Sequence, residues 1–166
     1  MKPESSKAVN AMLEQAFESL QARAYEPAVA AFTTCLALAP EAADAYRGRA
    51  TAHFETKNWR AAQSDFQRAK ELNPDDPENW IGLGLSLAMQ FQIYPAIDIL
   101  KALLQRQSDY LRAHLMLGLL HLRLGAVQKG QDYLHSALTL GPTLQEKQFI
   151  ESELNKQRTP TPHNPA

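Results

Sequence analysis

A sequence pattern with a period of 34 residues runs through this 166-residue chain and limits the folds that it can adopt. Pro40 and Pro74 lie 34 residues apart, and Pro142 follows two periods later. Residues of the same kind return at fixed distances before these prolines, first small and then large apolar ones: Ala28, Ala62, Ala96 and Gly130, then Phe32, Phe66, Leu100 and Leu134. Such a period is typical of short helical units that stack and bury a common core between them.

The third unit shows the pattern most fully. Trp80, Leu83 and Gly84 lie in its first half, and Ala96 and Leu100 lie in its second half. This series resembles the tetratricopeptide repeat family, whose pattern is W-x2-L-G-x2-Y, then A-x3-F, then a closing proline. The resemblance, to small bacterial-type members, implies an all-α, right-handed superhelical solenoid of four helical hairpins with a C-terminal capping helix. The repeats would occupy residues 9–42, 43–76, 77–110 and 111–144.

Local signals predict where some of the helices begin. Asp76 followed by Pro77 is typical of an N-cap and a first helical turn. Thr143 and Glu146 have the spacing of a capping box, which predicts a capping helix over residues 143–157. Its apolar side would carry three residues, Phe149, Ile150 and Leu154.

The two ends of the chain depart from the repeat. The first repeat has Met12, Gln15 and Ala16 where tryptophan, leucine and glycine are usual, as is common in terminal repeats. Residues 1–8 form a short polar N-terminal segment. Residues 158–166 are rich in proline, which predicts a disordered tail.

Composition narrows the range of partners and compartments. The formal net charge of −1 gives no electrostatic reason to expect nucleic acid as a partner. The N-terminus lacks the pattern of a signal peptide, and no apolar run predicts membrane insertion. The single cysteine, Cys35, fits a reducing compartment, so we expect a cytoplasmic location. Cys35 also takes a helix position usually held by alanine, which predicts a small buried core residue.

No grouping of residues in the sequence predicts catalysis. His114 and His121 lie seven residues apart on one predicted helix, which places them about 10.5 Å apart along its axis, too far for one metal ion. Gly82 and Gly84 have the spacing of the first two glycines of a dinucleotide-binding loop, but Leu87 stands where such a loop needs its third glycine. We therefore expect no enzyme, no cofactor and no bound metal.

The resemblance implies a concave groove lined by the first helix of each repeat. Transferring the family's lining positions onto this chain gives a candidate peptide-binding groove that is mainly apolar. Its residues are Leu13, Phe17, Leu20, Arg47, Thr51, Phe54, Ile81, Leu85, Met89, Arg112, Leu115, Leu119, Leu122 and Arg123. Contiguous exposed apolar surface of this kind usually marks an interaction site.

Two interpretations of the groove stay open. In the first, the protein is a non-catalytic scaffold or adaptor whose groove binds a protein partner, as a peptide or an amphipathic helix, with Arg47, Arg112 and Arg123 fixing its register. A looser resemblance to bacterial secretion chaperones, which hold apolar segments of exported proteins, implies a chaperone-like form of this function. In the second, the groove is filled by the chain's own N-terminal segment, by its tail or by a second copy, as in a self-assembling homodimer.

A carboxylate clamp is not predicted. Many family members hold the C-terminal carboxylate of a chaperone tail with lysine or arginine and asparagine side chains from three successive repeats. The asparagines are missing here in both possible frames, where the clamp positions hold Leu13, Phe17, Gly48, Glu78 and Gly82, or Arg47, Thr51, Gly82, Arg112 and Met116.

Overall fold

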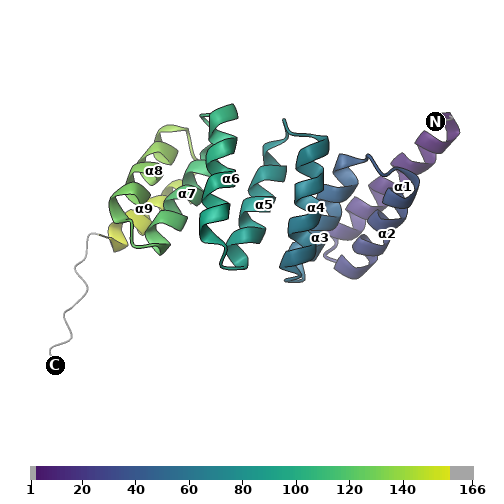
Figure 1. The fold of residues 1–166 in the computed structure, drawn as a ribbon, viewed down its shortest axis with the longest axis horizontal. Coiled ribbons are helices and arrows are strands. Elements are labelled where there is room, and N and C mark those ends of the chain that lie inside the picture. Colours follow the sequence, from purple (N-terminus) through teal and green to yellow (C-terminus); the bar gives the residue numbers. More distant parts are fainter. Residues whose placement is uncertain (1–2, 158–166) are drawn as a thin grey trace, which may run out of the picture. The chain divides into compact units, whose positions relative to one another are not determined.

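The computed structural model describes residues 3–157, and the predicted disordered tail at 158–166 lies outside the described residues. Every regular element within that range is an α-helix, as the sequence predicts (Figure 1). The helices are α1 (Pro3–Gln21), α2 (Tyr25–Leu38), α3 (Ala43–Glu55), α4 (Trp59–Leu72), α5 (Pro77–Met89), α6 (Ile93–Arg106), α7 (Leu111–Arg123), α8 (Val127–Thr139) and α9 (Leu144–Lys156). The predicted hairpins therefore correspond to α1/α2, α3/α4, α5/α6 and α7/α8.

The first helix begins earlier than the repeat boundary at residue 9. Helix α1 starts at Pro3, so the backbone of residues 3–8, expected as a polar segment ahead of the repeats, is helical. A proline at the start of a helix is tolerated because its missing N–H would have no intrahelical partner there.

The chain forms two compact units, Met1–Ile99 and Leu100–Ala166, and the division falls within α6. We call them the N-terminal and the C-terminal unit. In the N-terminal unit α1 packs on α2, α2 on α3, α3 on α4 and α4 on α5. Helix α1 also contacts α3, and α3 contacts α5, so the first helices of successive hairpins lie side by side.

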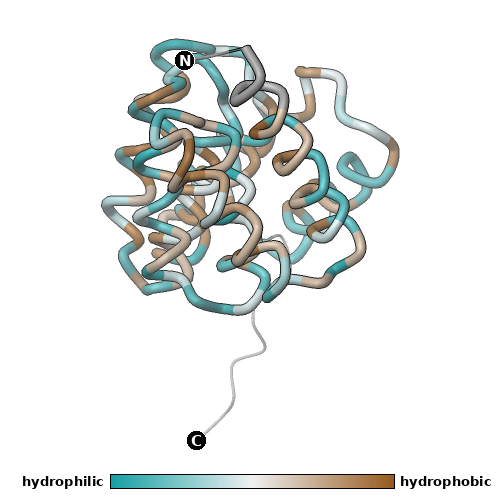
Figure 2. Tube along the Cα trace, turned by 90° about the vertical axis from the view of Figure 1, so that its right-hand side faces the viewer, coloured by the Kyte–Doolittle hydropathy of each residue, from teal (hydrophilic) through white to brown (hydrophobic). Residues whose placement is uncertain are grey.

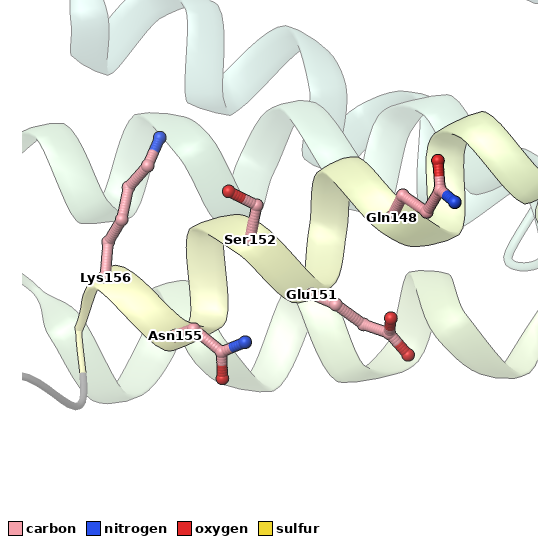
Figure 3. A pocket seen from close by; sticks show the side chains of 5 residues that line it. All are labelled: Gln148, Glu151, Ser152, Asn155 and Lys156. Carbon is pink, nitrogen blue, oxygen red and sulfur yellow. The ribbon is translucent and has the colours of Figure 1, made fainter.

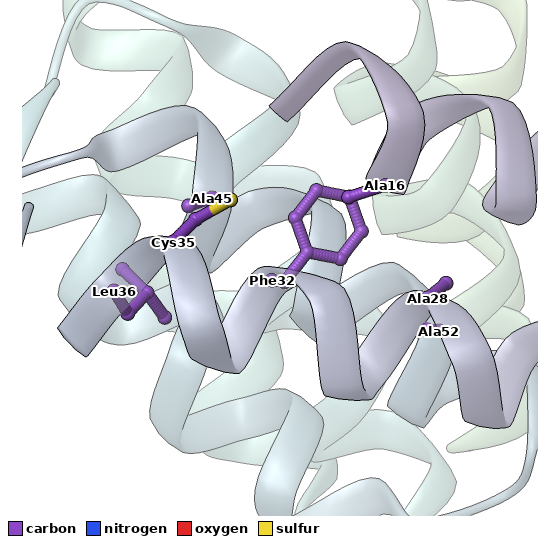
Figure 4. Packing of buried hydrophobic residues seen from close by; sticks show 7 residues of the cluster. All are labelled: Ala16, Ala28, Phe32, Cys35, Leu36, Ala45 and Ala52. Carbon is purple, nitrogen blue, oxygen red and sulfur yellow. The ribbon is translucent and has the colours of Figure 1, made fainter. Parts of the chain in front are cut away.

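A cluster of small and large apolar residues forms part of the core of the N-terminal unit (Figure 4). Its buried members are Ala16, Ala28, Phe32, Cys35, Leu36, Ala45 and Ala52. Cys35 is fully buried, and this burial raises the pKa of its thiol, which disfavours the reactive thiolate. The prediction that Cys35 is a small core residue is confirmed.

Successive hairpins of the N-terminal unit are joined by phenylalanine rings that lie directly on glycines. A Cβ atom added to Gly48 of α3 would lie 2.2 Å from Cζ of Phe32 in α2. The same atom on Gly82 of α5 would lie 2.3 Å from Cε1 of Phe66 in α4. No side chain larger than a hydrogen atom fits at either position unless the ring moves. We call each pair a phenylalanine–glycine joint.

In the C-terminal unit the closest packing is between α7 and α8. A Cβ atom on Gly118 would lie 2.7 Å from Cγ of Leu134, and one on Gly130 would lie 2.7 Å from Cγ of Leu122. Helix α9 covers this hairpin through Ile150 and Leu154, which are buried with Leu134 and Ala137.

The expected start of α9 is confirmed, whereas one residue of its apolar side is not. Thr143 and Glu146 form a complete capping box, in which the Thr143 backbone N–H donates to the Glu146 carboxylate at 2.9 Å. Phe149 is 45% exposed, so its assignment to the covered side is wrong. It adjoins Ile150 in sequence, and neighbouring residues on a helix point about 100° apart. The side of α9 shown in Figure 3 is polar, as is typical of a terminal helix in a repeat array.

Apolar and polar residues alternate along the chain instead of forming one long apolar run (Figure 2). Among the described helices, none has the length and apolar character needed to cross a membrane. The predicted start of α5 is confirmed, because the Asp76 carboxylate accepts the backbone N–H of Glu78 at 3.0 Å and Pro77 opens the helix.

Candidate protein-binding surface

The candidate groove residues on α1 are only partly covered by the core. Leu13, Phe17 and Leu20 are half-buried and pack against the cluster around Phe32. The ring of Phe17 meets the ring of Phe32 edge to face, with centroids 5.0 Å apart. The remaining surface of these three side chains faces away from the core and is accessible.

Arg47 links the three first helices of the N-terminal unit. Its guanidinium carbon lies 5.8 Å from the centroid of the Phe17 ring in α1. One Nη donates to Asp44 in the same helix at 2.9 Å, and Nε lies 3.3 Å from the carboxylate of Asp76, the N-cap of α5. This second contact is an ion pair without hydrogen-bond geometry, since the buried Nε has no hydrogen-bond partner among the described residues. The charge of Arg47 is thus already paired within the chain.

Two other candidates on α3 make contacts within their own hairpin. The Thr51 hydroxyl donates to the Arg47 carbonyl at 2.9 Å. Phe54 packs edge to face on Trp59 at the start of α4, with ring centroids 4.8 Å apart. Both side chains are half-buried, which leaves part of each accessible.

The three candidates on α5 differ widely in exposure. Ile81 is 1% exposed, so it belongs to the core and cannot contact a ligand in this structure. Leu85, one helical turn later, is half-buried, and Met89 is 44% exposed. The accessible apolar surface on α5 therefore increases toward its C-terminal end.

The candidates in the C-terminal unit are half-buried or exposed. Leu115 and Leu122 pack against the cluster of Leu134, Ala137, Ile150 and Leu154. Leu119 is half-buried, whereas Arg112 and Arg123 are exposed.

The most exposed apolar side chain near these residues was not predicted. A hollow of about 530 Å³ lies between the α3–α4 turn and the α5–α6 turn, lined by Lys57, Asn58, Trp59, Arg60, Met89, Gln90, Phe91 and Gln92. We call it the turn pocket. Phe91 is 78% exposed and has a φ of 62°. Arg23, Lys57, Phe91 and Gly125 share one position in successive repeats and all have positive φ, although only the last of them is a glycine.

Buried polar groups of the N-terminal unit are mainly structural. Arg49 and Asp65 form a two-pronged ion pair between α3 and α4, with N–O distances of 2.7 and 2.8 Å. The hydrogen bond to Asp65 raises the pKa of Arg49. Burial lowers the pKa of His53 on α3. Among the residues that the structure describes, no group of three histidine, cysteine, aspartate or glutamate side chains has a geometry suited to a metal ion.

Comparison with known proteins identifies the family. Models described as tetratricopeptide repeat match residues 19–83 and 96–144. Human tetratricopeptide repeat protein 13 is 32% identical over 91 residues, which are 55% of this chain and 10% of that protein. Mouse sperm-associated antigen 1 is 32% identical over 85 residues, 51% of this chain and 9% of that protein. The chain thus spans about a tenth of the length of these curated relatives.

Solved structures with the same fold cover most of the chain. A crystal structure of MamA has a TM-score of 0.75 at 22% identity and covers 85% of this chain and 80% of its own. The first tetratricopeptide repeat domain of Spaghetti (RPAP3), bound to the HSP90 peptide SRMEEVD, has a TM-score of 0.68 at 19% identity, with 72% of this chain and 95% of its own covered. Together with the two family models, which match more than half of the sequence, these similarities show that the chain belongs to the tetratricopeptide repeat family.

Proposed function

We propose that this protein is a non-catalytic interaction adaptor whose N-terminal unit binds an apolar segment of a partner protein along α1, α3 and α5. The observation that carries the proposal is a set of partly exposed apolar side chains on three helices that lie side by side. They are Leu13, Phe17, Leu20, Phe54, Leu85 and Met89. Accessible apolar side chains on neighbouring helices favour the docking of an extended peptide or an amphipathic helix.

The charges near this face favour acidic residues in the partner. Lys57 and Arg60 line the turn pocket together with Met89, and no carboxylate lines it. A partner segment with acidic residues next to its apolar ones would match both features. Arg47 contributes less to this match, since Asp44 and Asp76 already neutralise it.

The fold of a peptide-binding neighbour supports the same class of function. The structural neighbour from Spaghetti (RPAP3) is bound to a peptide that contains acidic residues. Our proposal does not include a carboxylate clamp, because this chain lacks asparagine at the clamp positions. The single buried thiol of Cys35 is consistent with a cytoplasmic site of action.

Selection from a displayed library of random peptides tests the proposal directly. We expect enriched peptides that combine apolar and acidic residues, and their binding should be lost in the variant Leu85→Asp with Met89→Asp. The control is Leu144→Asp on α9, where an equally apolar and 71% exposed side chain lies outside the proposed face. Helicity measured by circular dichroism should be the same in all three proteins.

One outcome of these experiments would contradict the adaptor proposal. If no peptide is enriched and light scattering shows a dimer that the double variant converts to a monomer, the face binds a second copy and the adaptor proposal is wrong. If the double variant loses its helical signal, Leu85→Ser and Met89→Ser replace the aspartates and the same comparison is repeated.

A further inference from the structure

A second hollow lies in the C-terminal unit. It has a volume of about 340 Å³ and is lined by Lys101, His121, Lys129, Asp132, Tyr133 and Ser136. These residues come from the last part of α6 and from α7 and α8. None of them belongs to the predicted concave groove, so neither the repeat pattern nor the proposed function explains why two lysines and a histidine meet here. We call it the basic pocket.

Three polar groups of the basic pocket have no hydrogen-bond partner in the described part of the chain. His121 is 8% exposed, and its buried Nε2 makes no hydrogen bond there. Lys101 and Lys129 likewise form no ion pair or hydrogen bond with any described residue. A buried polar atom without a partner is unfavourable, which points to a group from outside the chain that satisfies it.

The imidazole of His121 is held in place and lies in positive potential. Its ring stacks on Tyr133, with an interplanar angle of 4° and centroids 5.5 Å apart. Burial lowers the pKa of His121, and the charges of Lys101 and Lys129, which line the same hollow, lower it further. The neutral imidazole can present an Nε2–H donor without adding a third positive charge.

The one carboxylate in the basic pocket does not cancel its charge. Asp132 accepts a hydrogen bond from the side-chain amide of Gln128 at 2.9 Å. Ser136 donates to the Asp132 carbonyl at 3.0 Å and so is held against its own helix. The lining therefore contains two cations and one anion, with the donors of both cations available.

We propose that the basic pocket binds a phosphate monoester group, with its oxygens held by the ammonium groups of Lys101 and Lys129 and by Nε2–H of His121. A phosphate dianion offers two negative charges to the two ammonium groups and several strong acceptor oxygens to the three donors. A single carboxylate has half this charge and fewer acceptor sites. The phosphate group belongs either to a small metabolite or to a phosphorylated side chain of a protein, since both present the same chemistry.

Nuclear magnetic resonance of the His121 ring tests the site with inorganic phosphate as the first probe. We expect a saturable shift of the His121 ring signals and a rise in the pKa of His121 when phosphate binds, because the anion offsets the two ammonium charges. Lys101→Ala and Lys129→Ala should each weaken binding about tenfold or more, since each removes one charged hydrogen bond. Lys147→Ala, which alters an exposed lysine on α9, is the matched control and should bind like wild type.

Two further comparisons test whether the pocket is selective for phosphate and identify the kind of molecule that carries the phosphate group. Acetate should bind at least about tenfold more weakly than phosphate at equal ionic strength, and equal binding would overturn the assignment to phosphate. A short peptide with one phosphoserine is compared with free O-phosphoserine: tighter binding of the peptide identifies a phosphorylated protein, and equal binding identifies a small phosphate.

The site does not exist if the His121 signals fail to saturate with phosphate, or if Lys101→Ala and Lys129→Ala bind phosphate as well as wild type. Both lysines are exposed, so neither variant should impair folding. These outcomes are independent of the peptide-binding proposal, because the face that it uses lies in the N-terminal unit.

Discussion

At the scale of single residues, the turn inside each hairpin places demands on the backbone that the repeat pattern alone does not reveal. Arg23, Lys57 and Phe91 have φ values of 58°, 62° and 62°, and Gly125 takes the same place with a φ of 73°. Only glycine adopts this conformation without steric cost. A bulky and exposed phenylalanine at such a position is a local strain that the rest of the fold holds in place.

At position 91 we therefore expect glycine to be more stabilising than alanine, which is the reverse of their usual order in a helix. Inside a helix alanine is the more stabilising of the two, but at a φ of 62° the Cβ atom of alanine is unfavourable. We expect Phe91→Gly to be more stable than Phe91→Ala by about 1 kcal/mol, measured by urea unfolding. Comparing these two variants removes the ring from both, so the difference reports the backbone alone. Equal stability would mean that the turn relaxes out of this conformation.

The phenylalanine–glycine joints lead to a second prediction. Gly82→Ala should lower the free energy of unfolding by about 1–2 kcal/mol, because the added Cβ atom overlaps the Phe66 ring and this strain exceeds the gain in helix propensity. Adding Phe66→Leu should recover part of the loss, since a smaller side chain leaves room for the methyl group. If the two substitutions are additive in urea unfolding, the joint is not the cause of the loss.

At the scale of helices, the sequence was sufficient to predict the start of a helix wherever one capping residue determines it. Asp76 and Thr143 each cap the helix predicted for them, because a cap acts on the backbone within three residues. It was insufficient where exposure depends on packing between helices. Ile81 and Leu85 are both apolar and lie one turn apart on α5, yet only Leu85 retains accessible surface. Their difference depends on the positions of neighbouring helices, and a repeat pattern does not contain that information.

The cap of α9 can be tested on its own. Thr143→Ala should destabilise this helix by about 1 kcal/mol, because the backbone N–H of Glu146 loses its acceptor at the start of the helix. Hydrogen exchange should show faster opening of residues in α9, whereas α3 and α4 in the other unit should exchange as in wild type. Thr143→Ser, which keeps the hydroxyl, is the matched control and should leave the exchange of α9 unchanged.

At the scale of the whole molecule, two histidines, the half-buried His53 and the buried His121, connect stability to pH. Burial lowers the pKa of His53 in the N-terminal unit and of His121 in the C-terminal unit below the value of about 6.5 that they have when unfolded. Near and below this pH the unfolded chain binds more protons than the folded one, so stability rises with pH. The full contribution of the neutral histidines is present above about pH 6.5 and is lost as the pH falls from that value through the lower pKa of the folded state.

We therefore expect a lower urea midpoint at pH 5.5 than at pH 7.5. The variant His53→Gln with His121→Gln should show a smaller difference between the two pH values, since glutamine does not titrate. Glu146, whose pKa is lowered by its hydrogen bonds to Thr143, titrates at lower pH and contributes little in this window. An unchanged difference in the variant would assign the pH dependence to other groups.

The phenylalanine–glycine joints also bear on how such a chain can lengthen over evolutionary time. The hairpin of α3 and α4 takes part in two joints. Gly48 contacts the ring of Phe32 from the hairpin before it, and Phe66 contacts Gly82 of the hairpin after it. A tandem duplication of this segment would produce two neighbours that already fit each other, with no further substitution. A hairpin lacking the glycine could not be inserted at the same place without a clash. Residues 43–76 therefore form a unit that gene duplication can repeat without further substitution.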